Sequence, residues 1–176
     1  MALKMPQGAS SETKVAVTFK ELSKTASSLN SATDRLNLAI QQLNDALKEL
    51  NLGVSSWTTF ATWEDGPFST EEQIGYDKWG GKWGIALRKI FEDQSSANEQ
   101  PEDVTTWAFP EAPREMRIRA ISHLHELLAK LIEDAEKTTK VVMTKTIEAE
   151  QLAKAIFQLA DDESEKTMTP PPTEAK

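Results

Sequence analysis

The stretch LNSATDRLNLAIQQLNDALKELN, residues 29–51, places a leucine at every seventh position and repeats a Leu-Asn-x-Ala core. The complete leucine row consists of Leu22, Leu29, Leu36, Leu43 and Leu50, with Val15 one heptad earlier. A second apolar row stands four residues after these positions, at Phe19, Ala26, Thr33, Ile40 and Leu47. A strict 3.5-residue repeat over this many turns is typical of a helix wound against partner helices. The pattern predicts a coiled-coil helix over residues 12–52, with the leucine row as an oligomer seam.

A second helical arm is predicted over residues 111–161, and Pro113 suits its first turn. Its apolar repeat consists of Ile121, Leu128, Ala135, Val142, Ala149 and Ile156. The two arms would be about 60 and 70 Å long at 1.5 Å per residue, and such similar lengths favour an antiparallel hairpin. In that hairpin the leucines nearest the loop find apolar partners, whereas Leu22 and Leu29 would face lysine and threonine. We therefore expect these two leucines to be covered by another copy of the chain or by a partner helix.

The segment between the arms, residues 53–110, has a different composition. It holds all five tryptophans and the only tyrosine, and eleven acids face four bases between Leu52 and Ala112. The run Trp79-Gly80-Gly81-Lys82-Trp83 predicts a tight β-hairpin, because two adjacent glycines favour the primed two-residue turn. Such a turn would pair Lys78 with Trp83, Tyr76 with Ile85, and Ile74 with Leu87. The predicted fold class is mainly α with a small β insertion (α+β): a long antiparallel helical hairpin or coiled coil capped by a three- to four-stranded antiparallel β module.

One face of the predicted β-hairpin carries Asp77 and Arg88, with small residues between them at Gly75, Gly84 and Ala86. Glycines inside strands usually mark the close approach of a ring or of another backbone. Two interpretations stay open. We call the shallow surface over these small residues the floor. Either the ring of Trp57 or Trp63 covers the floor, or the floor is open to a ligand flanked by Asp77 and Arg88. Buried Trp57, and tryptophan fluorescence that no ligand quenches, would support the first.

The first turns of the second arm carry three cations, Arg114, Arg117 and Arg119, where the helix dipole disfavours them. One explanation is ion pairing with neighbouring acids such as Asp103 or Glu111. The other is an anion site completed by Arg88 and the N-terminus of the helix.

An asparagine follows each of the last four leucines, at Asn30, Asn37, Asn44 and Asn51. These amides either form a ladder that fixes register or partner choice across the helices, or face water as a flanking polar row. Replacement by alanine would alter the oligomeric state only in the first case.

Composition argues against several function classes. The formal charge of −8 and the pI near 4.9 argue against nucleic acid and anionic membranes as partners. The chain has no cysteine for a thiol nucleophile or a zinc site. His123 and His125 stand two apart in a helix and cannot share a metal. We therefore expect no catalytic residue, cofactor or metal, and the absence of a signal-like or membrane-spanning apolar run predicts a cytoplasmic location.

These features predict a non-enzymatic oligomerisation or protein-interaction protein, with self-associating arms, a dimer favoured, and an acidic aromatic module available to a partner. The candidate partner or ligand surface comprises Trp57, Asp77, Trp79, Arg88, Arg114 and Arg117. The order long helix, β-hairpin region, long helix resembles that of prefoldin-type chaperone subunits, which implies a holdase as one alternative. A small-ligand or anion sensor that uses the β module is the other alternative.

The terminal segments 1–11 and 162–176 are expected to be disordered, because their composition cannot bury a core.

Overall fold

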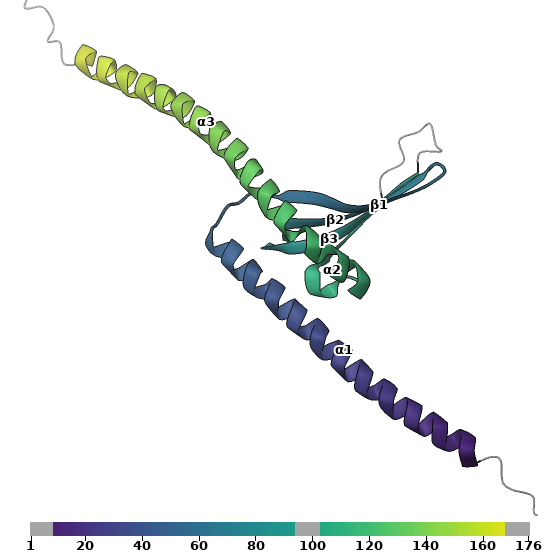
Figure 1. The fold of residues 1–176 in the computed structure, drawn as a ribbon. Coiled ribbons are helices and arrows are strands. Elements are labelled where there is room, and N and C mark those ends of the chain that lie inside the picture. Colours follow the sequence, from purple (N-terminus) through teal and green to yellow (C-terminus); the bar gives the residue numbers. More distant parts are fainter. Residues whose placement is uncertain (1–8, 94–102, 168–176) are drawn as a thin grey trace, which may run out of the picture.

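The computed structural model describes residues 9–93 and 103–167, with side chains described for 13–93 and 103–158. Helix α1 spans Ala9–Glu49. The four strands are β1 (Ser56–Asp65), β2 (Phe68–Trp79), β3 (Lys82–Asp93) and β4 (Asp103–Ala108). The chain then forms a 3-10 turn η1 (Phe109–Glu111), a short helix α2 (Arg114–Ala120), a second 3-10 turn η2 (Ile121–His123) and the long helix α3 (Leu124–Thr167) (Figure 1). Residues 1–8 and 168–176, parts of the two segments expected to be disordered, lie outside the described residues.

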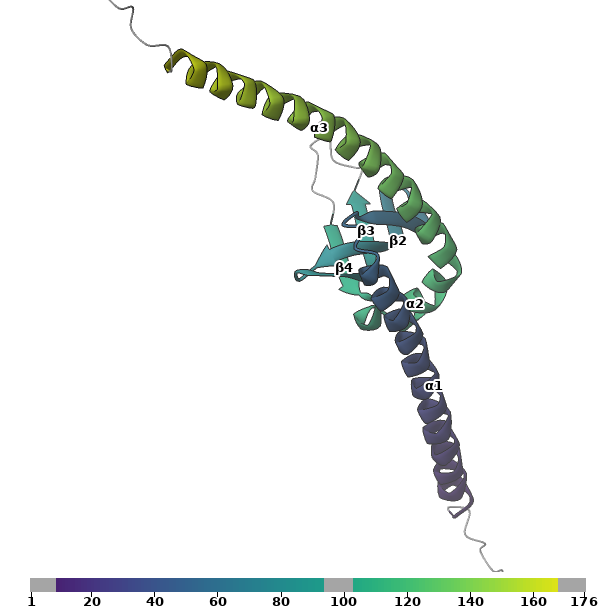
Figure 2. The same ribbon diagram turned by 90° about the vertical axis from the view of Figure 1, so that its left-hand side faces the viewer.

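The mixture of helix and sheet agrees with the predicted α+β composition, but the predicted antiparallel helical hairpin is wrong. Figures 1 and 2 show α1 and α3 leaving the sheet toward opposite ends of the molecule. Helix α3 packs over β1 and β2, whereas α1 packs beside β3. The sheet holds both helices near its own strands, and beyond it they diverge, so they do not pair along their lengths. The β segment is therefore the centre of the fold and not a cap on a hairpin.

The sheet is an antiparallel meander with the order β1-β2-β3-β4. Its central turn is the predicted one, with positive φ angles of 55° at Gly80 and 81° at Gly81. The predicted register is confirmed in the pairs Lys78–Trp83, Tyr76–Ile85 and Ile74–Leu87. Strands β2 and β3 are each 12 residues long, so this sheet is much larger than the small cap expected from the sequence.

The core lies between one face of the sheet and the nearby ends of the helices. Its largest fully buried side chains are Tyr76, Phe109, Ile74, Leu87, Leu127 and Leu131. Tyr76 also stacks on Trp83, with 5.5 Å between ring centroids, and burial raises the pKa of its hydroxyl. Helix α1 contributes buried Ile40 and Leu47, which belong to the second apolar row. Within the leucine row, Leu36 and Leu43 pack against this core but are only partly buried.

Two asparagine side chains hold α1 against α2. The Oδ1 atom of Asn30 accepts a hydrogen bond from Nη2 of Arg114 at 3.0 Å, and Oδ1 of Asn37 accepts one from Nη1 of Arg117 at 2.8 Å. The Arg117 side chain is buried, so the Asn37 amide stabilises a guanidinium that has lost most of its water. Asn30 and Asn37 therefore fix the position of α2 on α1 within a single chain.

Asn44 extends this row to the sheet. Its Oδ1 atom accepts a hydrogen bond of 2.6 Å from the main-chain N–H of Ile85. The pairing of β3 with β4 begins one residue later, at Ala86 and Ala108, so the amide takes the place of a strand beyond the end of β4. Asn51 has a different role: it follows the end of α1 with a positive φ of 48°, in the left-handed conformation that ends many helices.

Replacing Asn37 by alanine should destabilise the protein, because Arg117 loses its acceptor while remaining largely buried. Removing the acceptor of a buried charged donor costs ~1–3 kcal/mol, which corresponds to a melting temperature lower by roughly 3–10 °C in a chain of this size. Thermal denaturation followed by circular dichroism measures this change. The matched control is Gln42→Ala at an exposed position of α1. An equal loss in both variants would show that the amide contact has no special part in stability.

Candidate interaction site

Both long helices continue well beyond the sheet as uncovered arms. Every described side chain from Thr13 to Ala32, and from Glu136 to Gln158, is exposed. We call residues 9–32 the α1 arm and residues 136–167 the α3 arm. Isolated helices of such length are marginally stable in water unless an apolar face is covered.

The α1 arm carries a row of large apolar side chains with exposed fractions of 46–69%, at Val15, Phe19, Leu22 and Leu29. Their spacings of three, four and seven residues place them on one face of the helix. The same face is buried farther along the helix at Ile40 and Leu47. The α1 arm is therefore the continuation of a core-forming stripe past the point where the chain's own core ends.

The α3 arm and the turn before it are also rich in exposed apolar residues. Those exposed by 57–71% are Ile132, Val141, Val142, Met143, Ile147, Leu152, Ile156 and Phe157. At helical spacing Ile132, Met143, Ile147 and Phe157 share one side of α3, whereas Val141, Leu152 and Ile156 lie on another. Apolar side chains gathered on an exposed face often mark an interaction site.

An apolar groove of about 710 Å³ lies where the end of α1 approaches α3. Leu47, Leu50 and Leu52 line one side, and Leu131, Ile132 and Met143 line the other. Leu131 is 2% exposed and belongs to the core, whereas Ile132 and Met143 are 63% and 64% exposed. The groove is hollow because the short side chains of Ala135 and Thr139 lie between these larger ones on α3. It thus connects the buried core to the uncovered α3 arm.

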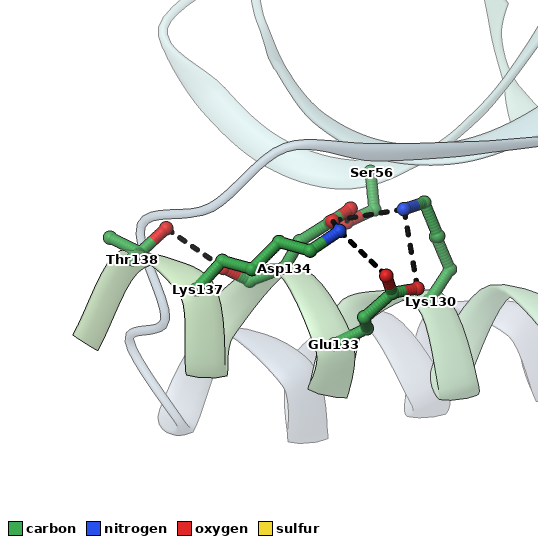
Figure 3. A network of polar contacts seen from close by, with 6 residues as sticks. All are labelled: Ser56, Lys130, Glu133, Asp134, Lys137 and Thr138. Atoms are coloured by element: carbon green, nitrogen blue, oxygen red, sulfur yellow. Dashed lines mark hydrogen bonds and ion pairs between the residues drawn. The ribbon is translucent and has the colours of Figure 1, made fainter. Parts of the chain in front are cut away.

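A polar network fixes α3 on the sheet beside this groove (Figure 3). The Ser56 hydroxyl of β1 donates to Asp134 Oδ2 at 2.7 Å, and Lys130 Nζ donates to Asp134 Oδ1 at 3.0 Å. The Ser56 hydrogen bond, followed by that from Lys130, lowers the pKa of the Asp134 carboxyl. Glu133 accepts from Lys137 at 2.6 Å, and this hydrogen bond is the main cause of its lowered pKa. The hydrogen bond to Asp134 raises the pKa of Lys130.

Trp57 covers the Gly75 end of the floor predicted on the β-hairpin, whereas Asp77, Gly84 and Ala86 line a hollow of about 480 Å³ near the turn. Trp57 pairs with Gly75 in the sheet, and a Cβ added at Gly75 would overlap the indole ring. The guanidinium of Arg88 lies 4.1 Å from the centre of this ring, a cation–π arrangement. Arg88 Nε also donates to Gln73 Oε1 at 2.7 Å. Trp57 is half-buried instead of fully buried, and its ring occupies the space above Gly75.

The other members of the predicted surface lie at two further places. Asp77 is half-buried near the hairpin turn, where its Oδ1 accepts the N–H of Lys78 at 2.7 Å, and Trp79 beside it is 46% exposed. Arg114 and Arg117 bind α1, on the side of the sheet where the helices pack. Strand alternation places Arg88 on the opposite face from Leu87 and the core, so the structure does not unite Arg88 with these arginines in one anion site.

Arg119 forms an ion pair, as one of the two explanations predicted, but its partner is Glu72. Its Nη2 atom lies 2.6 Å from Oε2 of Glu72, and its guanidinium is 5.6 Å from the ring centre of Trp63. Glu72 replaces the expected Asp103 or Glu111, because β2 and not the loop before α2 lies beneath this helix.

The groove residues Ile132 and Met143 were not among the predicted site residues. Ile132 flanks the apolar repeat of the second arm, and in the predicted hairpin it would have packed against the first arm. The signal that was available is the spread of apolar residues such as Val141 and Ile147 beyond a single helical seam. That spread indicates a wide apolar surface, but its position beside α1 depends on the tertiary structure.

Replacing Gly75 by alanine should displace the Trp57 ring, because the added methyl group has no room. Overpacking of this kind costs ~1–3 kcal/mol, and we expect the melting temperature to fall by several degrees. Tryptophan emission should shift to longer wavelength, and the shift should be absent when the same substitution is made together with Trp57→Phe. Gly84→Ala is the control, since its nearest neighbours are the Asn44 amide atoms at 3.8 Å. Unchanged emission in Gly75→Ala would contradict the covered floor.

The Ser56–Asp134 hydrogen bond should stabilise the protein in a pH-dependent way. Because folding lowers the pKa of Asp134, the associated stability is present above the pKa of the unfolded state and is lost as the pH falls through the folded-state pKa. Ser56→Ala should therefore lower the melting temperature near neutral pH and have a smaller effect below about pH 3. Ser122→Ala, at an exposed position, serves as the control. An effect of Ser56→Ala that stays constant with pH would rule out this linkage.

Within the part of the chain that the structure describes, no helix is long and apolar enough to cross a membrane. The same residues contain no group of three or more His, Cys, Asp or Glu side chains that could hold a metal ion. Comparison of the chain with protein-family models, with curated proteins and with solved structures found no match.

Proposed function

We propose that this chain is a non-enzymatic assembly protein that associates with a second copy of itself through its two helical arms. The observation that carries this proposal is the continuity of the apolar stripe on α1. Its inner residues, Ile40 and Leu47, are 3% and 5% exposed, whereas Leu22 and Leu29 on the same face are 61% and 46% exposed. The same face of α1 is thus buried in one half of the helix and exposed to solvent in the other. A second molecule that buries the exposed half best explains this pattern.

The energetics favour association. A large aliphatic or aromatic side chain contributes ~1.5–3 kcal/mol when it moves from water to a fully buried position. The α1 arm offers four such side chains, and α3 offers eight from Ile132 onward. Even partial burial of this set in each of two chains exceeds the ~4–15 kcal/mol cost of bringing two molecules together. A second copy is the simplest partner, because closed two-fold pairs are the commonest oligomers.

The β module offers a second surface to a different partner. Trp63, Phe68 and Phe91 are 40–46% exposed and line a hollow together with Asp65, at the end of the sheet away from its central turn. Phe68 and Phe91 stack with 5.8 Å between centroids. An acidic aromatic surface of this kind supports the proposal that the module is available to a partner while the arms associate. We also propose a cytoplasmic location for this assembly.

The geometry gives less support to the two alternative functions. The resemblance to prefoldin-type subunits depends on two arms paired side by side, and here the arms diverge (Figure 1). The sensor depends on an open floor between Asp77 and Arg88, but Trp57 fills the space above Gly75, and the hollow beside Asp77 does not include Arg88.

Size-exclusion chromatography with light scattering tests the proposed self-association. We expect the mass of two 19.6 kDa chains for the wild-type protein and a shift toward a single chain for the double variant Leu22→Lys, Leu29→Lys. Both leucines are exposed, so the substitutions should leave the fold intact by circular dichroism. Leu38→Lys is the matched control, because Leu38 is 56% exposed but lies on another side of α1. A wild-type protein that stays a single chain at micromolar concentrations would overturn the proposal.

A further inference from the structure

We infer that the apolar groove is closed by the α1 arm of a second copy, so that each α1 arm packs antiparallel along the α3 arm of its partner. This inference rests on the proposed self-association and adds which helix pairs with which. It also makes the groove an incomplete site in the single chain, which the second copy completes.

The directions of the arms leave two ways to cover both of them in a closed pair. Figures 1 and 2 show the α1 and α3 arms pointing to opposite ends of the molecule. A two-fold axis along the molecule would pair α1 with α1 and α3 with α3, each in parallel. A two-fold axis across the molecule would pair α1 with α3 twice. In that second arrangement the helices are antiparallel, because α1 runs toward its sheet and α3 runs away from its own.

Charge favours the pairing of unlike arms. The whole α3 arm has seven acids and five lysines, a net charge of −2, and its excess of acids lies between Thr146 and Thr167, whereas the α1 arm has three lysines and two acids, a net charge of +1. Parallel pairing of two α3 arms would bring the negative segments together. Antiparallel pairing instead places the acidic end of α3 beside the N-terminal end of α1, where the helix dipole is positive. Unlike pairing therefore removes a repulsion and adds an attraction.

Side-chain size favours the same arrangement. The stripe of the α1 arm consists of large residues such as Phe19, Leu22 and Leu29. The groove is hollow at Ala135 and Thr139 of α3, whose short side chains leave space for large ones. Packing large residues against small ones fills volume at native density, whereas pairing short positions with short positions leaves voids. The α1 arm is about 36 Å long and the α3 arm about 48 Å, so one can cover most of the other.

The inference also limits the register. The α1 helix of the second copy can follow α3 only as far as Leu29, because Asn30 already binds Arg114 of its own α2. Leu29 of one copy is therefore the large residue that reaches farthest into the groove of the other, where it packs into the hollow at Thr139 beside Met143. Residues nearer the N-terminus of α1 lie progressively closer to the acidic end of α3.

Disulfide cross-linking distinguishes the two arrangements, and the chain has no cysteine of its own to interfere. Leu29→Cys would be mixed with each of Thr139→Cys, Met143→Cys and Ile147→Cys after unfolding and joint refolding. We expect an efficient disulfide between different variants, strongest at or next to Met143, and at least 10-fold less for each variant alone. Leu38→Cys is the control that should not cross-link to any of the three. Non-reducing electrophoresis and mass spectrometry of the linked peptides measure the outcome.

The outcomes separate this inference from the proposal on which it rests. Efficient links within Leu29→Cys alone or within Met143→Cys alone, in a protein with the mass of two chains, overturn unlike pairing and leave self-association standing. A wild-type protein of single-chain mass without any cross-link overturns both.

A second measurement does not depend on disulfide geometry. Leu29→Lys and Met143→Glu should each weaken the dimer, by about 10-fold or more in Kd, because each puts a charge into an apolar contact. When both substitutions stand in one chain, unlike pairing brings the two new opposite charges together across the interface. The double variant should then bind at least as tightly as either single variant. A double variant that is weaker by the product of the two single effects would contradict the pairing.

Discussion

The fold depends on the register of the β2–β3 hairpin, which the turn at Gly80 and Gly81 sets. Because strand side chains alternate, this register places Ile74 and Leu87 on one face and Gly75 on the other. A slip by a single residue would exchange the two faces. On the first face the helices and the 3-10 turn build the core, and on the second Trp57 covers the glycine. The core on one face of the sheet and the Trp57 contact on the other therefore both follow from one two-residue turn.

Local patterns predicted the parts of the molecule that local physics determines. Paired glycines between strand-like runs indicated the turn and its register, and a glycine within a strand indicated the ring that covers it. The direction of the two arms could not be predicted in the same way. A heptad repeat shows that a helix has an apolar face, but not whether a helix, a sheet or another molecule covers it. The second apolar row, with Ile40 and Leu47, packs on the sheet, and this required knowledge of how large the sheet is.

The candidate site was predictable to a similar extent. Leu22 and Leu29 were expected to lack partners within the chain, and both are exposed. The roles of Arg114 and Arg117 were not predictable, because arginine ordinarily suggests a carboxylate or an anion and here the acceptors are the amides of Asn30 and Asn37. Only the tertiary structure brings amides and guanidinium groups from positions about 80 residues apart into contact.

The short length of β4 has a consequence for the solubility of the folded chain. Before Ala86, the first residues of β3 pair with β2 on one side but have no strand on the side where β4 would continue. An unprotected strand edge is a template on which strands of other molecules can add. The Asn44 amide occupies the N–H of Ile85 at this edge, and α1 lies beside it. The long helix is thus also a guard against aggregation at this one place: while it stays docked, no foreign strand can pair with β3 at Ile85.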